Sequence, residues 1–130
     1  MPLANDGPIL AFDNGASAIA QGKVVKLGTS GDDAGKTVVT AANTDVIFGV
    51  VTEDASAGGQ AAVAVAGSGA VVLVEAHAAV ALGALLMPAG AGRAATATSG
   101  KHVLGVALEA AAAQGALIKV VLGQSNKPTA

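Results

Sequence analysis

The stretch that decides the fold is IFGVVTEDASAGGQAAVAVAG, residues 47–67. It aligns without gaps on VLGVALEAAAAQGALIKVVLG, residues 103–123, at an offset of 56 residues. The identical positions include three glycines and a glutamate: Gly49 and Gly105, Gly59 and Gly115, Gly67 and Gly123, and Glu53 and Glu109. An internal repeat implies two similar structural units. The chain is therefore expected to consist of two similar halves.

A second, weaker pair of similar segments precedes the two copies: IAQGKVVK from Ile19 and VALGALLM from Val80. The same order of elements is therefore predicted for each half. A strand after Gly22 or Gly83 leads into a hairpin and then a strand that ends in Glu53 or Glu109, and a turn of small residues and a closing strand follow. We expect an all-β fold, a small pseudo-symmetric barrel or sandwich built from two repeated halves. Residues 18–123 form its single domain, between an N-terminal arm, residues 1–17, and a C-terminal tail, residues 124–130.

The second copy has a helical alternative, because ALEAAAAQGAL, residues 107–117, has high helix propensity. The equivalent segment of the first copy contains a glycine pair, which disfavours a helix. Both segments are therefore predicted to be loops, with one helical turn at residues 109–113. Strand alternation places Ile47 and Val51 on one face and Phe48 and Val50 on the other. Phe48 and its counterpart Leu104 are expected in the core.

A glycine-rich loop, LGTSGDDAGKTVV at residues 27–39, resembles a nucleotide-binding P-loop. Ser30 occupies the position of the first required glycine. A P-loop also opens a helix, whereas residues 37–40 are all β-branched and favour a strand. The stretch predicts a β-hairpin with a polar turn.

Composition limits the possible partners. The chain is 52% hydrophobic but 2% aromatic, so a single protomer is expected to be modestly stable and to gain from association. Its net charge is −2 and it has no run of Lys or Arg, so nucleic-acid binding is not expected. Without cysteine it has no disulfide and no thiolate site. The N-terminal residues lack the pattern of a secretory signal.

Residues 61–87 are almost wholly apolar and long enough to cross a bilayer. Glu75 and His77 lie near the middle of this segment, where charge is costly in a membrane. The segment predicts two strands, residues 62–66 and 70–76, joined by a Gly-Ser-Gly turn. No membrane partner is expected.

Candidate catalytic and metal-binding side chains are few. His77 and Glu75 could form half of a metal site, but no further histidine or cysteine completes it, and His102 is expected in a hairpin turn. Glu53 and Glu109 could form a glycosidase carboxylate pair, but the chain has no Trp or Tyr to bind a sugar. Each glutamate is instead expected to end a strand, facing solvent or a backbone amide. We predict no catalysis, no metal and no cofactor.

Four segments within residues 18–123 resemble a known family: AQGKVVKLG, FGVVTEDASAGGQAAVAVAG, ALGALLMPAG and VLGVALEAAAAQGALIKVVLG. The chain resembles the small phage capsid decoration proteins, also called cement proteins. This resemblance implies an all-β structural virion protein, made in the host cytoplasm, that binds the outer surface of an icosahedral head and stabilises it. It also implies two partners, the major capsid protein and further copies of the chain in a homotrimer.

The N-terminal arm is the predicted contact surface for the capsid or a neighbouring subunit. It contains two prolines, which disfavour helix, and a set of apolar side chains. An arm of this kind is ordered only when it packs against something. The predicted contact residues are Pro2, Leu3, Ile9, Leu10 and Phe12. The alternative is that the arm covers its own domain.

A second function remains open from the sequence. A pseudo-symmetric β-barrel could be a non-catalytic carrier or accessory domain that presents a lysine on a hairpin turn. Lys36 and Lys101 are both expected in such turns.

Overall fold

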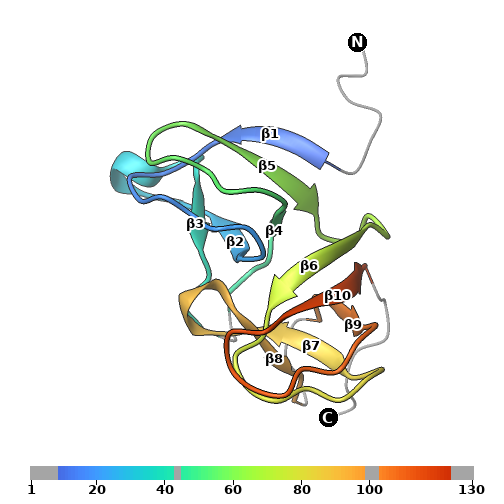
Figure 1. The fold of residues 1–130 in the computed structure, drawn as a ribbon. Coiled ribbons are helices and arrows are strands. Elements are labelled where there is room, and N and C mark those ends of the chain that lie inside the picture. The colour runs from blue at the N-terminus through green and yellow to red at the C-terminus, as the bar shows by residue number, and fades with distance from the viewer. Residues whose placement is uncertain (1–8, 43–44, 99–102, 124–130) are drawn as a thin grey trace.

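The structure is a computed structural model that describes residues 9–42, 45–98 and 103–123. Its described residues form two five-stranded antiparallel sheets, with two three-residue 3-10 helices in turns. The all-β prediction is confirmed, and the two similar halves form a sandwich rather than a closed barrel (Figure 1).

The first sheet has the order β1-β5-β4-β2-β3 and the second β6-β10-β9-β7-β8. The strands of the first half are β1 (Ile9–Asp13), β2 (Val24–Leu27), β3 (Thr37–Val39), β4 (Gly49–Val51) and β5 (Gln60–Val65). Those of the second half are β6 (Val71–Glu75), β7 (Leu85–Pro88), β8 (Ala94–Thr96), β9 (Gly105–Ala107) and β10 (Leu117–Leu122). The 3-10 helices η1 (Gly31–Asp33) and η2 (Gly90–Gly92) lie in the β2–β3 and β7–β8 turns.

The two sheets have the same topology when β1 is matched with β6 and the other strands follow in turn. Gly49 lies opposite Val65 in the first sheet, and Gly105 lies opposite Leu122 in the second. Val65 and Leu122 are thus equivalent, whereas the gapless sequence match pairs Val65 with Val121. The turn that precedes β10 therefore has one residue more than the turn that precedes β5.

The predicted hairpin around the glycine-rich loop is confirmed. β2 and β3 pair in antiparallel register, with Val25 opposite Val39 and Leu27 opposite Thr37. Gly31 and Gly35 have φ angles of 67° and 76°, values that residues with a side chain rarely adopt. The glycines of this loop therefore serve the turn geometry.

Three local predictions are wrong. Residues 108–116 contain no helical turn, and β4 and β9 end at Val51 and Ala107, two residues before the glutamates. The predicted alternation also fails, because Ile47 packs into the same cluster as Val50, while Phe48 packs with Val51. β4 begins only at Gly49, so the period of two does not extend back to residues 47 and 48.

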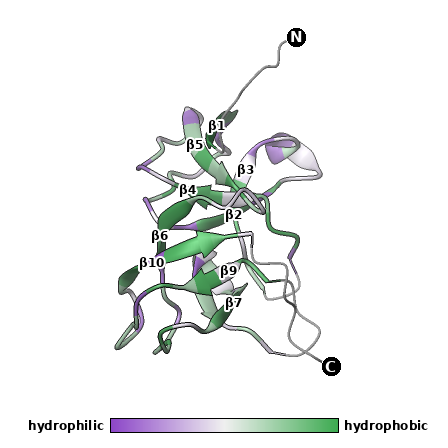
Figure 2. Cartoon of the chain, turned by 90° about the vertical axis from the view of Figure 1, so that its right-hand side faces the viewer, coloured by the Kyte–Doolittle hydropathy of each residue, from purple (hydrophilic) through white to green (hydrophobic). Residues whose placement is uncertain are grey.

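Two apolar clusters form the core. The larger contains the inner side chains of the second half together with Val24, Val50 and Ala64 of the first. The smaller contains only residues of the first half, including Val25, Val51 and Val63. Strands of both sheets are accordingly coloured as hydrophobic in Figure 2. Leu104 is buried as predicted, whereas Phe48 is only half-buried.

The apolar segment at residues 61–87 does not form one element. It contributes the two predicted strands, β5 and β6, which belong to different sheets and are joined by the turn at residues 66–70. In the part of the chain that the structure describes, no helix has the length and hydropathy needed to span a membrane.

Candidate functional site

The described part of the predicted contact surface lies on β1. This strand forms one edge of the first sheet and pairs with β5 from Ile9 opposite Ala64 to Asp13 opposite Gln60. Ile9 is 50% exposed, and Leu10 and Phe12 are half-buried. Pro2 and Leu3 lie outside the described residues. The contact role of all five residues stays a prediction.

Phe12 and Phe48, both half-buried, pack edge to face, with ring centroids 4.7 Å apart. Phe48 also packs against the smaller core cluster, so the aromatic pair connects β1 to that core. The equivalent positions in the second half, Val74 and Leu104, are fully buried. The interior of the first half is therefore the more exposed of the two.

Asn14, directly after β1, is a buried polar residue of the first half, and both ends of its side-chain amide are hydrogen-bonded. Its amide nitrogen donates hydrogen bonds to the carbonyl oxygens of Ser17 and Ser56, at 3.0 and 2.9 Å. Its amide oxygen accepts a 2.8 Å hydrogen bond from the buried Thr37 hydroxyl. The Asn-Gly dipeptide indicates a turn in sequence, and nothing local to it indicates this burial.

A cluster of three charges joins the two halves. Glu75, at the end of β6, pairs with Lys23 of the first half and with Arg93 of the second, each at 2.7 Å. Burial of Glu75 acts to raise its pKa, but the hydrogen bonds and positive charges of Lys23 and Arg93 outweigh it and hold the pKa below its ordinary value. Sequence reasoning missed this cluster because its three members lie far apart along the chain.

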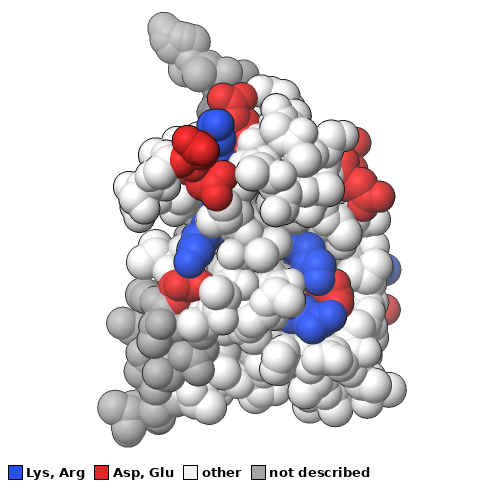
Figure 3. All heavy atoms as spheres, turned by 90° about the vertical axis from the view of Figure 1, so that its left-hand side faces the viewer, with Lys and Arg blue, Asp and Glu red and all other residues white. Residues whose placement is uncertain are grey.

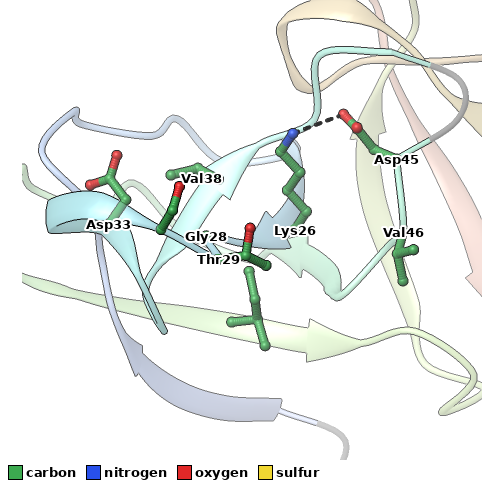
Figure 4. Close-up of a pocket in the computed structure, with 9 residues that line it drawn as sticks. Lys26, Gly28, Thr29, Asp33, Val38, Asp45 and Val46 are labelled. Atoms are coloured by element: carbon green, nitrogen blue, oxygen red, sulfur yellow. Dashed lines mark ion pairs between the residues drawn. The ribbon is translucent and has the colours of Figure 1, made fainter.

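The hollow drawn in Figure 4 has a volume of about 490 Å³ and lies beside the β2–β3 hairpin. Its charged lining residues are Lys26, Asp33 and Asp45, and Lys26 pairs with Asp45 at 3.3 Å. The Ala41 backbone N–H, with further help from Lys26, holds the pKa of Asp45 below its ordinary value. Two acidic groups and a paired lysine do not suit a phosphate, and Lys36 is not among the lining residues.

The candidate metal and acid-base residues are not brought together. His77 is exposed beyond the end of β6, while the neighbouring Glu75 pairs with Lys23 and Arg93, and His102 lies outside the described residues. Within residues 9–42, 45–98 and 103–123, no three His, Cys, Asp or Glu side chains are placed to hold a metal ion.

The two repeat glutamates have different surroundings. Glu53 is exposed, and Glu109 accepts a 2.8 Å hydrogen bond from the backbone N–H of Lys119. This agrees with the expected solvent-facing or amide-capping roles, although the amide belongs to β10 rather than to the following loop. Of the two turn lysines, Lys36 is half-buried just before β3, and Lys101 lies outside the described residues.

Charge is sparse on the face shown in Figure 3. Acidic and basic atoms lie in small mixed groups, and most of the face carries neither kind. No basic stripe of the kind that follows a phosphate backbone is visible there. By contrast, several large apolar side chains are exposed on the described part of the chain.

Comparison with known proteins gives a family. The family model described as phage cement protein matches residues 4–122. Among solved structures, the head fiber gp8.5 N base in bacteriophage phi29 has the same fold, with a TM-score of 0.72 and 22% sequence identity. The match covers 94% of this chain and 99% of that one. No curated protein sequence matches. Because the family model spans nearly the whole chain, the protein belongs to the phage cement protein family.

Proposed function

We propose that this protein binds the outer surface of an icosahedral phage head as a homotrimer and stabilises the assembled shell. Membership of the cement family indicates a structural, non-catalytic protein of the phage head. That membership is the observation that carries the proposal. Its partner on the head is the major capsid protein. The protein is made in the host cytoplasm and then binds the head.

The surface chemistry is consistent with this role. A structural partner needs apolar area and few uncompensated charges at the contact. The described residues supply exposed apolar side chains on both halves, including Ile9, Val71 and Leu82.

Stabilisation would follow from mass action. A ligand that binds only the assembled shell stabilises it by RT ln(1 + [L]/Kd), or about 2.7 kcal/mol per site at a free concentration of 100 Kd. No chemical step is needed. The protein therefore has to present a folded surface that matches a site formed only by neighbouring capsid subunits.

The test uses heads from a phage that encodes this chain, assembled without it. Purified protein is added to expanded and to unexpanded heads, and bound protein is measured by co-sedimentation and electron cryo-microscopy. Saturable binding with new density on the outer surface supports the proposal. Absence of binding to either form of head would overturn it.

A further inference from the structure

The two halves of one chain contact each other through different surfaces. The outer face of the first sheet, with Val24, Val50 and Ala64, packs into the larger cluster beside the inner side chains of the second half. All three side chains are fully buried. A two-fold arrangement would bury the same face on both halves.

Among the described residues, the equivalent face of the second sheet is less buried. Sheet register makes Leu85, Val106 and Val121 the counterparts of those three residues, and each is only half-buried. At the rim of this face Leu82 and Leu108 are 69% and 42% exposed. Their first-half counterparts are the polar residues Gln21 and Thr52. The less buried face is thus the more apolar of the two.

The turns at the edge of the interface show the same asymmetry. The Gly22 carbonyl oxygen accepts a 2.9 Å hydrogen bond from the Glu75 backbone N–H, on the edge of β6 that faces away from β10. The loop at Gly22 packs against the second sheet, where an added Cβ would lie 2.6 Å from Leu117 Cδ2 and in ordinary contact, at 3.5 Å, with the Leu73 carbonyl oxygen. Its counterpart Gly83 has no described atom within 4 Å of the equivalent position.

The η2 turn shows the same relationship next to the Gly22 loop, where a Cβ added at Gly92 would lie 3.1 Å from the Val24 carbonyl oxygen. The carbonyl oxygen of Ala89 accepts a 3.0 Å hydrogen bond from the buried Thr40 hydroxyl, and Gly92 N donates to Thr40 O at 2.9 Å. In the first half, Gly31 of η1 has open space within 4 Å among the described atoms. In the described part of the chain, each half therefore has one surface that contacts the other half and one that does not.

The two unused surfaces are the counterparts of the two surfaces that meet within the chain. The first half presents the free edge of β1, the η1 turn, and the half-buried Phe12 and Phe48. Asn14 N donates to Gly59 O, so by antiparallel alternation Ala11 and Asp13 direct their backbone groups away from β5, to the free edge. The same register positions on β6 receive the Gly22 loop.

We infer that the outer face of the second sheet, around Leu82, Leu85, Val106 and Leu108, docks the first half of a second copy in the same head-to-tail geometry that joins the two halves within one chain. This inference rests on the self-association included in the proposed function. A heterologous contact of this kind forms a ring or an open filament, depending on its rotation. We assign the ring, and the homotrimer of the proposed function then places six similar halves around one axis.

The test exploits the absence of native cysteine. Within one chain, Gln21 and Leu73 line the same hollow between the halves. Their counterparts on the unused surfaces are Leu82 and Ala11, both exposed. The variant Ala11→Cys with Leu82→Cys is oxidised, both free and bound to heads, and analysed by denaturing electrophoresis. The variant Gln21→Cys with Leu73→Cys is the matched control and should cross-link within one chain.

The expected result for the double-cysteine variant is a ladder of covalent species that ends at three linked copies. Each single-cysteine variant can form only one disulfide per chain, so its largest covalent species is a dimer. A ladder beyond three copies would contradict ring closure. Absence of covalent trimer in both free and head-bound protein would overturn the inference, and normal head binding in the same experiment would leave the proposed function standing.

A second variant avoids dependence on disulfide geometry. Leu82→Asp places a charge on an exposed side chain, so folding should be retained. Light scattering should show at least a tenfold weaker self-association than for the unmodified chain. Ala57→Asp, on the exposed turn before β5, is the control and should associate normally. Unchanged association of Leu82→Asp would count against this face.

Discussion

Lys23 Nζ lies 2.7 Å from Glu75 Oε1, and this ion pair joins the first half of the chain to the second. Arg93 contacts the other carboxylate oxygen at the same distance. Both side chains of the Lys23–Glu75 pair are largely shielded from water, with 17% and 15% of their surface exposed. The cluster therefore couples the packing of the halves to the ionisation of one carboxyl group.

Glu75→Gln should lower the free energy of unfolding at pH 7 by about 1 to 3 kcal/mol, because it leaves two half-buried cations without their charged partner. Urea unfolding measures the change. Glu53→Gln, on an exposed side chain, is the control and should stay within about 0.5 kcal/mol of the unmodified protein. Equal effects of the two substitutions would contradict a stabilising role for the cluster.

The same cluster predicts a direction for pH dependence. The folded state holds the pKa of Glu75 below its ordinary value of 4.5, so the stabilisation is complete above that pH. It is lost as the pH falls through the lower folded-state pKa. Unfolding curves between pH 7 and pH 3 should show this loss, and Glu75→Gln should reduce it. A parallel pH profile for the variant would be the contrary result.

Asn14→Ala should destabilise the first half by at least about 2 kcal/mol, because Thr37 and two backbone carbonyls lose their hydrogen-bond partner. The second half has Ala76 and Ala94 at the equivalent positions. The double variant Asn14→Ala with Thr37→Ala copies that pair and should recover part of the loss. Strictly additive losses in urea unfolding would argue against the coupled hydrogen bond.

Leu104→Ala should cost about 2 to 5 kcal/mol, the usual range for a buried leucine. Phe48→Ala should cost less in the isolated protomer, since Phe48 is only half-buried. Thermal unfolding at low protein concentration compares the two. A larger loss for Phe48→Ala under those conditions would mean that its environment in solution is more enclosed than in the structure.

The fold followed from the sequence to a large extent because the repeat fixed which segments had to share a structure. The glycine pair in the first copy excluded a helix in the alanine-rich second copy. The sequence analysis did not identify β1 as part of the repeat, although β1 (ILAFD) and β6 (VVLVE) both have four apolar residues before an acidic one. The head-to-tail packing of the two halves could not be predicted, because a sequence repeat is equally compatible with a two-fold arrangement of the halves. The two arrangements differ in which face of each sheet is buried.

Removal of residues 1–8 tests the predicted contribution of the N-terminal arm while leaving β1 intact. If Pro2 and Leu3 contact the capsid, the shortened protein should fold normally and bind heads at least tenfold more weakly. Circular dichroism and light scattering establish fold and oligomeric state before co-sedimentation with heads. Undiminished head binding would remove the first eight residues from the contact surface.

The most direct test of the proposed function is electron cryo-microscopy of expanded heads. The heads are assembled without this protein and then saturated with it. We expect new density on the outside of the shell, at sites shared by neighbouring capsid subunits, that accommodates three copies of the two-sheet fold. The decorated heads should also release their DNA at a higher temperature than bare heads. Heads that show no added density at saturating protein concentration, and that release DNA at an unchanged temperature, would contradict the proposal.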